Sequence, residues 1–191
     1  MIGTDLSLAM LTAADKDTTL KYVGAKAEEL PFADSAFDLV MVALAFHWFE
    51  RERFLAEARR VLRTDSWLVI YNNGFLGTMT ENPAFAHWLR DSYITRYPSP
   101  PRRSEPFTEE DAAKLGFDFA RREHYQSDVV FGLQELVAYL LTQSNLIAVI
   151  EEGSESIEGV RAWLNRELAP LFPTTHGTFQ FGGTIWYLQR A

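Results

Sequence analysis

The sequence predicts an α/β fold built around a parallel β-sheet, and three consecutive segments carry this prediction. Residues 37–45 form an apolar run of strand length without alternation, which is typical of a strand buried on both faces. Residues 51–63 place apolar side chains at helical spacing between Arg and Glu, as an amphipathic helix does. Residues 67–71 are again apolar. The order strand, helix, strand with short connections indicates a right-handed parallel crossover.

The composition limits the class of protein. The chain has 191 residues, 26 of them acidic and 18 basic, a formal net charge of −8 and no cysteine. This length favours one domain over residues 1–191. The negative charge disfavours nucleic acid and anionic membranes as partners, because both require a surface of opposite sign. The apolar runs are too short to span a membrane and the lack of cysteine fits a reducing compartment, so we expect a cytoplasmic protein.

The elements before and inside this unit follow from short patterns. Residues 1–5 predict the end of a strand, and Ser7 stands at the N-cap position of a helix over residues 8–14. A second short strand is expected over residues 20–23. Thr64, Asp65 and Ser66 are expected to turn the chain from the helix into the strand at residues 67–71.

The composition changes after this strand. Residues 75–107 contain a predicted helix over residues 83–94 and then four prolines, so we interpret them as an insertion or lid. A capping box formed by Thr108 and Asp111 opens a helix that stops at Gly116.

The last third of the chain alternates between strand and helix. Residues 117–131 are expected as one or two strands, and residues 133–150 and 157–168 as helices. Residues 179–188 are expected as a final strand interrupted by Gly182 and Gly183.

Four short motifs occur in order at residues 27–63: AEELPF, FDLV, HWF and RVLR. Together they resemble the class I S-adenosylmethionine-dependent methyltransferases, in particular the small-molecule enzymes of ubiquinone and menaquinone biosynthesis and trans-aconitate methyltransferase. The resemblance is strong over residues 1–75 and looser afterwards. It implies a Rossmann-like methyltransferase sheet with helices on both faces, S-adenosylmethionine as cofactor and methyl transfer to a small-molecule substrate.

The resemblance also implies a set of cofactor-binding residues. Asp5 matches the acidic position after the family's second strand, where a carboxylate accepts hydrogen bonds from the two ribose hydroxyls. The remaining positions lie near the adenine or at the carboxyl end of the next strand, where ligands bind in open α/β sheets: Leu6, Met10, Ala27, Glu28, Ala43 and Leu44.

Candidate residues for the acceptor side carry alternative interpretations. His47 has a side chain whose ordinary pKa suits a general base, or it packs at the start of a helix. Trp48 forms a substrate wall or packs. Arg96, with Arg102 and Arg103, binds an acidic substrate or lies on a solvated loop. The four histidines show no helical pairing, so we expect no metal site.

Two departures from the family keep a second hypothesis open. No Gly-x-Gly-x-Gly loop occurs, so a strand, loop and helix of roughly 30 residues are missing before Asp5. Lys26 stands where the family often has an Asp that accepts from the adenine amino group. The chain is thus either a methyltransferase or a non-catalytic, truncated methyltransferase-like chain or subunit that cannot bind the cofactor alone. A homodimer in which a partner supplies the missing strand is one way to complete the sheet.

Overall fold

The structure, a computed structural model, describes residues 1–14, 19–99 and 106–191. The chain forms two compact units. Unit 1 comprises Met1–Asn72, Arg103–Glu123 and Thr184–Ala191, and unit 2 comprises Asn73–Arg102 and His124–Gly183. Most of the segment interpreted as a lid therefore belongs to unit 2. Arg102 and Arg103 lie outside the described residues.

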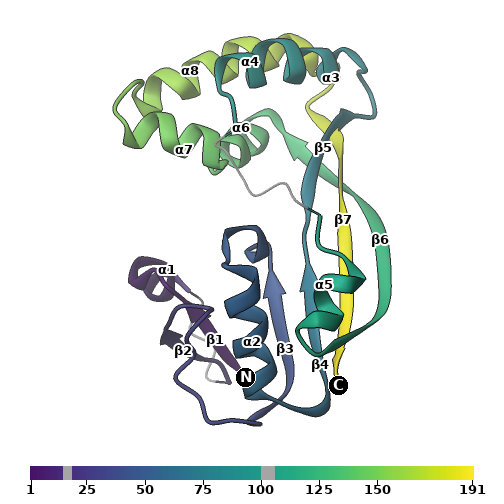
Figure 1. Cartoon of the computed structure of the whole chain (residues 1–191). Coiled ribbons are helices and arrows are strands. Elements are labelled where there is room, and N and C mark those ends of the chain that lie inside the picture. Colours follow the sequence, from purple (N-terminus) through teal and green to yellow (C-terminus); the bar gives the residue numbers. More distant parts are fainter. Residues whose placement is uncertain (15–18, 100–105) are drawn as a thin grey trace. The chain divides into compact units, whose positions relative to one another are not determined.

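The N-terminal part of unit 1 forms as the sequence predicts. Strands β1 (Ile2–Asp5) and β2 (Lys21–Gly24) pair in parallel as a two-stranded sheet, and α1 (Leu8–Ala13) lies between them in the chain. Ser7 caps α1, because its hydroxyl accepts a hydrogen bond from the Met10 amide at 3.3 Å. Figure 1 shows these three elements grouped beside one another.

The predicted strand–helix–strand unit is confirmed. It consists of β3 (Phe37–Ala43), a 3₁₀ turn η1 (Phe46–Trp48), α2 (Arg51–Val61) and β4 (Leu62–Tyr71), and β3 pairs with β4 in parallel. The predicted turn over residues 64–66 is wrong, because β4 begins directly at Leu62. The register shifts between Phe37 and Leu39, and Asp65 takes a φ of 61°. A local irregularity in the strand thus replaces the turn.

The two faces of β3 differ in burial. One face packs against α2, which buries Phe54, Leu55, Ala58 and Val61. On the other face Leu39 is 49% exposed and Met41 58% exposed. The prediction that β3 is buried on both faces is wrong, because no described element of unit 1 covers this second face. The sheet is nevertheless flanked by helices, as an α/β fold requires.

Unit 1 is completed by α5 and parts of two long strands. Helix α5 (Glu109–Lys114) has the predicted capping box, in which the Asp111 amide donates to the Thr108 hydroxyl at 3.1 Å and the Thr108 amide donates to the Asp111 carboxylate at 3.0 Å. It ends before Gly116, whose φ of 79° suits glycine. Strands β6 (Phe117–Gly132) and β7 (His176–Arg190) continue into unit 2, and residues 185–189 of β7 pair antiparallel with β4.

Unit 2 contains one further strand and most of the helices. Strand β5 (Gly74–Met79) pairs antiparallel with β7, and β6 also pairs with β7. Figure 1 shows the helices of this unit gathered together. They are α3 (Ala84–Trp88), the π-helical turn η2 (Leu89–Tyr93), α4 (Ile94–Arg96), α6 (Leu133–Leu141), α7 (Ser144–Glu151), α8 (Ile157–Leu168) and the 3₁₀ turn η3 (Ala169–Leu171).

Two predictions in unit 2 need correction. The single helix expected over residues 133–150 is two helices with a 65° bend, because Gln143 adopts an extended conformation before α7. Strand β7 is continuous through Gly182. Glycine is needed there because a Cβ atom would lie 2.8 Å from the Tyr125 carbonyl oxygen, so close strand packing accounts for it. Within the described ranges, no single helix is long and apolar enough to cross a membrane.

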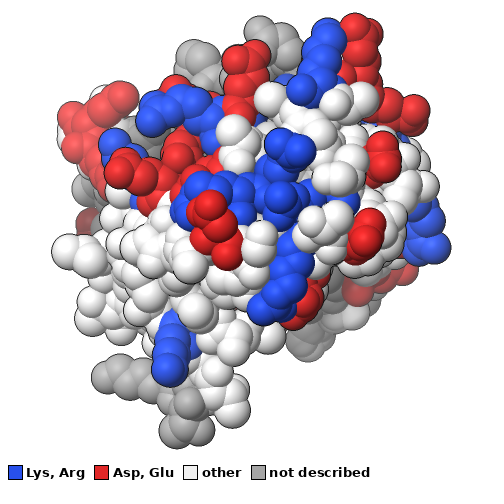
Figure 2. Space-filling view, turned by 60° about the horizontal axis from the view of Figure 1, so that its bottom comes forward, with Lys and Arg blue, Asp and Glu red and all other residues white. Residues whose placement is uncertain are grey.

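Two arginines of unit 1 form ion pairs with aspartates. Arg63 lies 2.5 Å from the Asp38 carboxylate and Arg60 lies 2.7 Å from Asp34. On the face of the molecule drawn in Figure 2, Lys and Arg side chains intermingle with Asp and Glu, with a broad uncharged area beside them.

Candidate functional site

Asp5 ends β1 in a turn that fixes its side chain. Its Oδ1 atom accepts a hydrogen bond from the Ser7 amide at 2.7 Å, and its backbone carbonyl accepts from the Ala25 amide at 3.1 Å. The carboxylate is thereby held at the carboxyl end of β1. Its other oxygen accepts no hydrogen bond from the described residues, so it retains acceptor capacity for a ligand hydroxyl.

Ala27 and Glu28 form the tip of a tight turn after β2. The turn is closed by the Glu29 amide, which donates to the Lys26 carbonyl at 3.1 Å. The Glu28 carboxylate accepts from the Glu50 amide at 2.9 Å and so ties the turn to the start of α2. This contact gives Glu28 a structural role in the described chain.

The carboxyl end of β3 has an unusual backbone. Leu44 follows the strand with a φ of 57°, a conformation that non-glycine residues seldom adopt. Its amide donates to the Tyr71 carbonyl at 3.0 Å, which holds the chain at the end of β4 before it turns into η1. Such strained residues are concentrated at functional sites, and this one lies where α/β sheets bind ligands.

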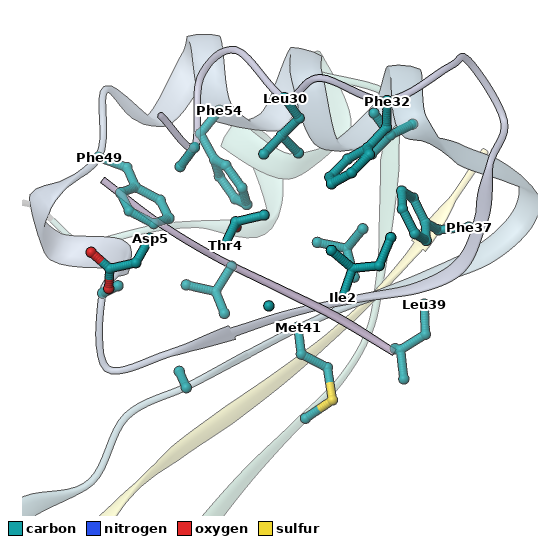
Figure 3. A pocket seen from close by; sticks show the side chains of 17 residues that line it. Ile2, Thr4, Asp5, Leu30, Phe32, Phe37, Leu39, Met41, Phe49 and Phe54 are labelled. Carbon is teal, nitrogen blue, oxygen red and sulfur yellow. The ribbon is translucent and has the colours of Figure 1, made fainter. Parts of the chain in front are cut away.

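A cavity of about 330 Å³ lies between β1 and β3, and we call it the β1–β3 cavity. Figure 3 shows Asp5 at one end of it, Leu30, Phe32 and Phe54 along one side, and Leu39 and Met41 along the other. Ala27 and Ala43 also line it. The structure therefore brings together three residues predicted from the family resemblance: Asp5, Ala27 and Ala43.

The lining of this cavity fits one half of S-adenosylmethionine. Asp5 is the single charged side chain among its described lining residues, and the walls are apolar and aromatic. A carboxylate beside apolar walls suits a nucleoside, because vicinal hydroxyls donate to the carboxylate and the base packs on the walls. The described lining offers no cation for the carboxylate of the methionine half.

A second cavity of about 180 Å³, which we call the His47 cavity, lies at the ends of β3 and β4. It is lined by Leu44 and His47 together with polar groups of Tyr71 and Asn72. Ala45 lines both cavities, so they lie on two sides of the same short segment. Trp186 also lines this cavity, and its buried Nε1–H group has no hydrogen-bond partner among the described residues.

The other predicted residues lie outside these two cavities. Leu6 is 68% exposed and Met10 61% exposed, although Met10 and Asp5 line a shallow depression beside α1. Trp48 is 59% exposed, with its ring centroid 4.7 Å from that of His47. Arg96 belongs to unit 2, where its guanidinium lies 3.0 Å from the Glu155 carboxylate and 5.1 Å from the Trp163 ring centroid. These contacts give Arg96 a packing role.

Several site residues were missed by the sequence analysis. Leu30 and Phe32, which form one wall, lie in the AEELPF motif, from which only Ala27 and Glu28 were predicted as site residues, and Trp186 lies in a strand with no site signal. The AEELPF motif was the available signal for the first two. As for metals, no group of three His, Asp or Glu side chains arranged as ligands occurs in the part of the chain that the structure describes.

Comparison with known proteins agrees with this geometry. Residues 1–70 match the methyltransferase domain family. A Dictyostelium discoideum protein provisionally named a methyltransferase is 25% identical over 160 residues, which cover 82% of this chain and 60% of that protein. The demethylmenaquinone methyltransferase of Thermotoga maritima is 43% identical over 72 residues, which cover 36% of this chain and 31% of that enzyme. The chain thus spans at most 60% of these curated relatives.

A solved structure supports the fold. A protein from Anaeromyxobacter dehalogenans, provisionally named a type II methyltransferase, superposes with a TM-score of 0.71 and 21% identity. The alignment covers 99% of this chain and 79% of that one. At this identity the likeness establishes the fold.

Proposed function

We propose that the protein is a class I methyltransferase that transfers a methyl group from S-adenosylmethionine to a small-molecule acceptor, a proposal supported by the fold and by the match of residues 1–70 to the methyltransferase domain family. The observation that carries this proposal is the β1–β3 cavity, which has Asp5 at the carboxyl end of β1 and Ala27 and Ala43 in its walls. Fold alone does not determine function, so the site must support the chemistry.

Residues that line the β1–β3 cavity would bind and orient the nucleoside half of the cofactor. Asp5 accepts hydrogen bonds from the two ribose hydroxyls, and its bond from Ser7 keeps the carboxylate aligned. Ala27 offers a backbone amide at the tip of its turn. The rings of Phe32 and Phe49 exclude water from the apolar walls. When bound, the cofactor supplies a methyl group activated by its sulfonium centre.

On the acceptor side, we propose His47 as the group that takes a proton from the acceptor. It lines the cavity that shares Ala45 with the β1–β3 cavity. Trp186 forms an aromatic part of the wall of that cavity. Because methyl transfer is an in-line displacement, alignment of acceptor and methyl group supplies most of the catalysis, and one base suffices.

As the alternative occupant of the space between β1 and β3, we propose a strand from a second copy of the chain, which would fill the β1–β3 cavity and exclude the nucleoside from it. Within the described residues, β1 pairs with β2 alone and β3 with β4 alone, so each presents one edge without a partner strand. Open edges favour pairing with another chain. On this alternative, analytical ultracentrifugation is expected to find a dimer at micromolar concentration, and a monomer up to about millimolar concentration would contradict it.

The experiment that tests the cofactor site is calorimetry of the chain with S-adenosylhomocysteine. We expect micromolar binding by the wild type and a loss of at least tenfold in Asp5→Asn. Asparagine keeps an oxygen for the Ser7 amide but loses the negative charge and an acceptor.

The matched control is Asp38→Asn. Asp38 lies on β3, its side chain is 81% exposed, and the substitution changes the net charge equally. The proposal fails if the wild type, shown to be folded by circular dichroism, does not bind at millimolar ligand. It also fails if Asp5→Asn binds as tightly as Asp38→Asn.

A further inference from the structure

Two charged residues on α2 form an ion pair that faces the polar segment after β2. Glu57 and Arg60 are three residues apart, and their side chains approach to 2.7 Å. The Glu57 side chain is 13% exposed and that of Arg60 is 34% exposed. The pair is therefore shielded from solvent much more than Arg53–Glu50 on the same helix, whose side chains are more than 60% exposed.

This pair binds the backbone of the segment at residues 30–34. The Leu30 amide donates to the Glu57 carboxylate at 2.6 Å. Arg60 donates to the Leu30 carbonyl at 3.0 Å, to the Phe32 carbonyl at 2.8 Å and to the Asp34 carboxylate at 2.7 Å. A segment without strand or helix partners thus has its backbone groups satisfied by two side chains of α2.

The guanidinium geometry explains how one side chain holds several groups. A planar guanidinium offers five N–H donors in fixed directions, whereas an ammonium is a single charged centre. Hydrogen bonds from Arg60 and the Leu30 amide lower the pKa of the Glu57 carboxyl, so the pair stays charged at neutral pH.

The segment held in this way forms a wall of the β1–β3 cavity. Leu30 and Phe32 line the cavity with their side chains (Figure 3). Their backbone groups bind Glu57 and Arg60, which are not among the lining residues. The same segment begins at the turn that carries Ala27, which also lines the cavity. The position of this wall therefore depends on contacts made by α2.

We propose that Glu57 and Arg60 are positioning residues for the nucleoside-binding wall, acting through the backbone of Leu30 and Phe32. This inference rests on the proposed function. It predicts that the affinity of the cavity for the nucleoside half of the cofactor depends on a charged pair that does not itself line the cavity.

The test combines hydrogen exchange with ligand affinity in the full chain. In Arg60→Met, we expect amide exchange over residues 27–34 to accelerate at least tenfold and S-adenosylhomocysteine binding to weaken at least tenfold. Arg60→Lys keeps the charge but cannot bridge the same acceptors, so it should recover only part of both. Arg53→Met removes an exposed arginine of α2 and should change neither.

The outcomes separate this inference from the proposed function and from a purely structural role. Accelerated exchange confined to residues 27–34 with weakened binding supports the inference. Wild-type affinity in Arg60→Met overturns it, as does a lower melting temperature without faster exchange in this segment. If the wild type does not bind the ligand, the proposed function fails, and the exchange data alone then decide whether Arg60 holds this wall.

Discussion

Unit 1 and unit 2 differ in how completely their residues are packed. The core of unit 2 is a continuous aromatic cluster. The ring centroid of Trp163 lies 6.1 Å from that of Trp88, on which it stacks, and 5.3 Å from that of Tyr97. Its buried Asn145 is satisfied by hydrogen bonds with the Tyr93 hydroxyl and the Tyr97 carbonyl. Unit 1 instead has exposed apolar residues on β3, edges of β1, β2 and β3 without a partner strand among the described residues, and the β1–β3 and His47 cavities.

This difference suggests that packing in unit 2 contributes mainly to stability and that unit 1 contributes mainly to ligand binding. Dense packing stabilises a fold but leaves little space for a ligand. A cavity with apolar walls and a fixed carboxylate lacks some packing contacts, and it provides a binding site in exchange. We therefore expect changes in unit 2 to act mainly on the free energy of unfolding and changes around the β1–β3 cavity to act mainly on affinity.

The largest expected effect comes from opening the core of unit 2. Trp163→Ala removes a side chain that is 8% exposed and should lower the free energy of unfolding by about 3–5 kcal/mol. Urea denaturation followed by circular dichroism measures this change. Ile157→Ala on the same helix is the control, because Ile157 is 41% exposed and should cost less than about 1 kcal/mol. Equal losses in the two variants would contradict the comparison.

Ionisation of a buried tyrosine in unit 2 should lower the free energy of unfolding at alkaline pH. Burial raises the pKa of Tyr93 to about 12, opposed by its hydrogen bond to Asn145. Because the folded-state pKa lies above the unfolded value, the contribution to stability is complete below about pH 10 and is lost as the pH rises toward 12. The loss should reach about 2–3 kcal/mol. Urea denaturation at several pH values should show a shallower decline in Tyr93→Phe, and an identical decline would refute the assignment.

Filling the β1–β3 cavity should lower the ligand affinity of unit 1 with little effect on its free energy of unfolding. Ala43→Phe places a ring in the cavity at an exposed position of β3, so S-adenosylhomocysteine affinity should fall at least tenfold, about 1.4 kcal/mol. The free energy of unfolding should change by less than about 1 kcal/mol. Ala56→Phe, at an exposed position of α2 that does not line the cavity, is the control for calorimetry. Unchanged affinity in Ala43→Phe would place the ligand elsewhere.

The smallest effect concerns a local contact in unit 1. Thr108→Ala removes the side-chain half of the capping box of α5 and should cost about 1 kcal/mol. Thr108→Ser keeps the hydroxyl and should retain most of that stability. Thermal denaturation distinguishes the two, and a Ser variant as unstable as the Ala variant would exclude the capping hydroxyl as the cause.

The sequence alone determined the elements whose signals lie within a few residues. The Ser7 cap, the Thr108–Asp111 capping box and the apolar periodicity of α2 are local, and each forms as predicted. It also placed Asp5, Ala27 and Ala43 by resemblance to a family, and the structure brings these three to one cavity. The physical reason is that helix caps and strand runs depend on neighbouring residues.

The tertiary structure decided what depends on partners far along the chain. Leu39 and Met41 belong to an apolar run, but their exposure reflects the absence of a covering element in described unit 1. The roles of Glu57 and Arg60 follow from backbone groups about 30 residues away, as shown by the Arg60 bond to the Leu30 carbonyl. Arg96 pairs with Glu155, which no local pattern links to it. Such contacts cannot be read from the sequence, because the two partners lie far apart along the chain and come within bonding distance only in the folded structure.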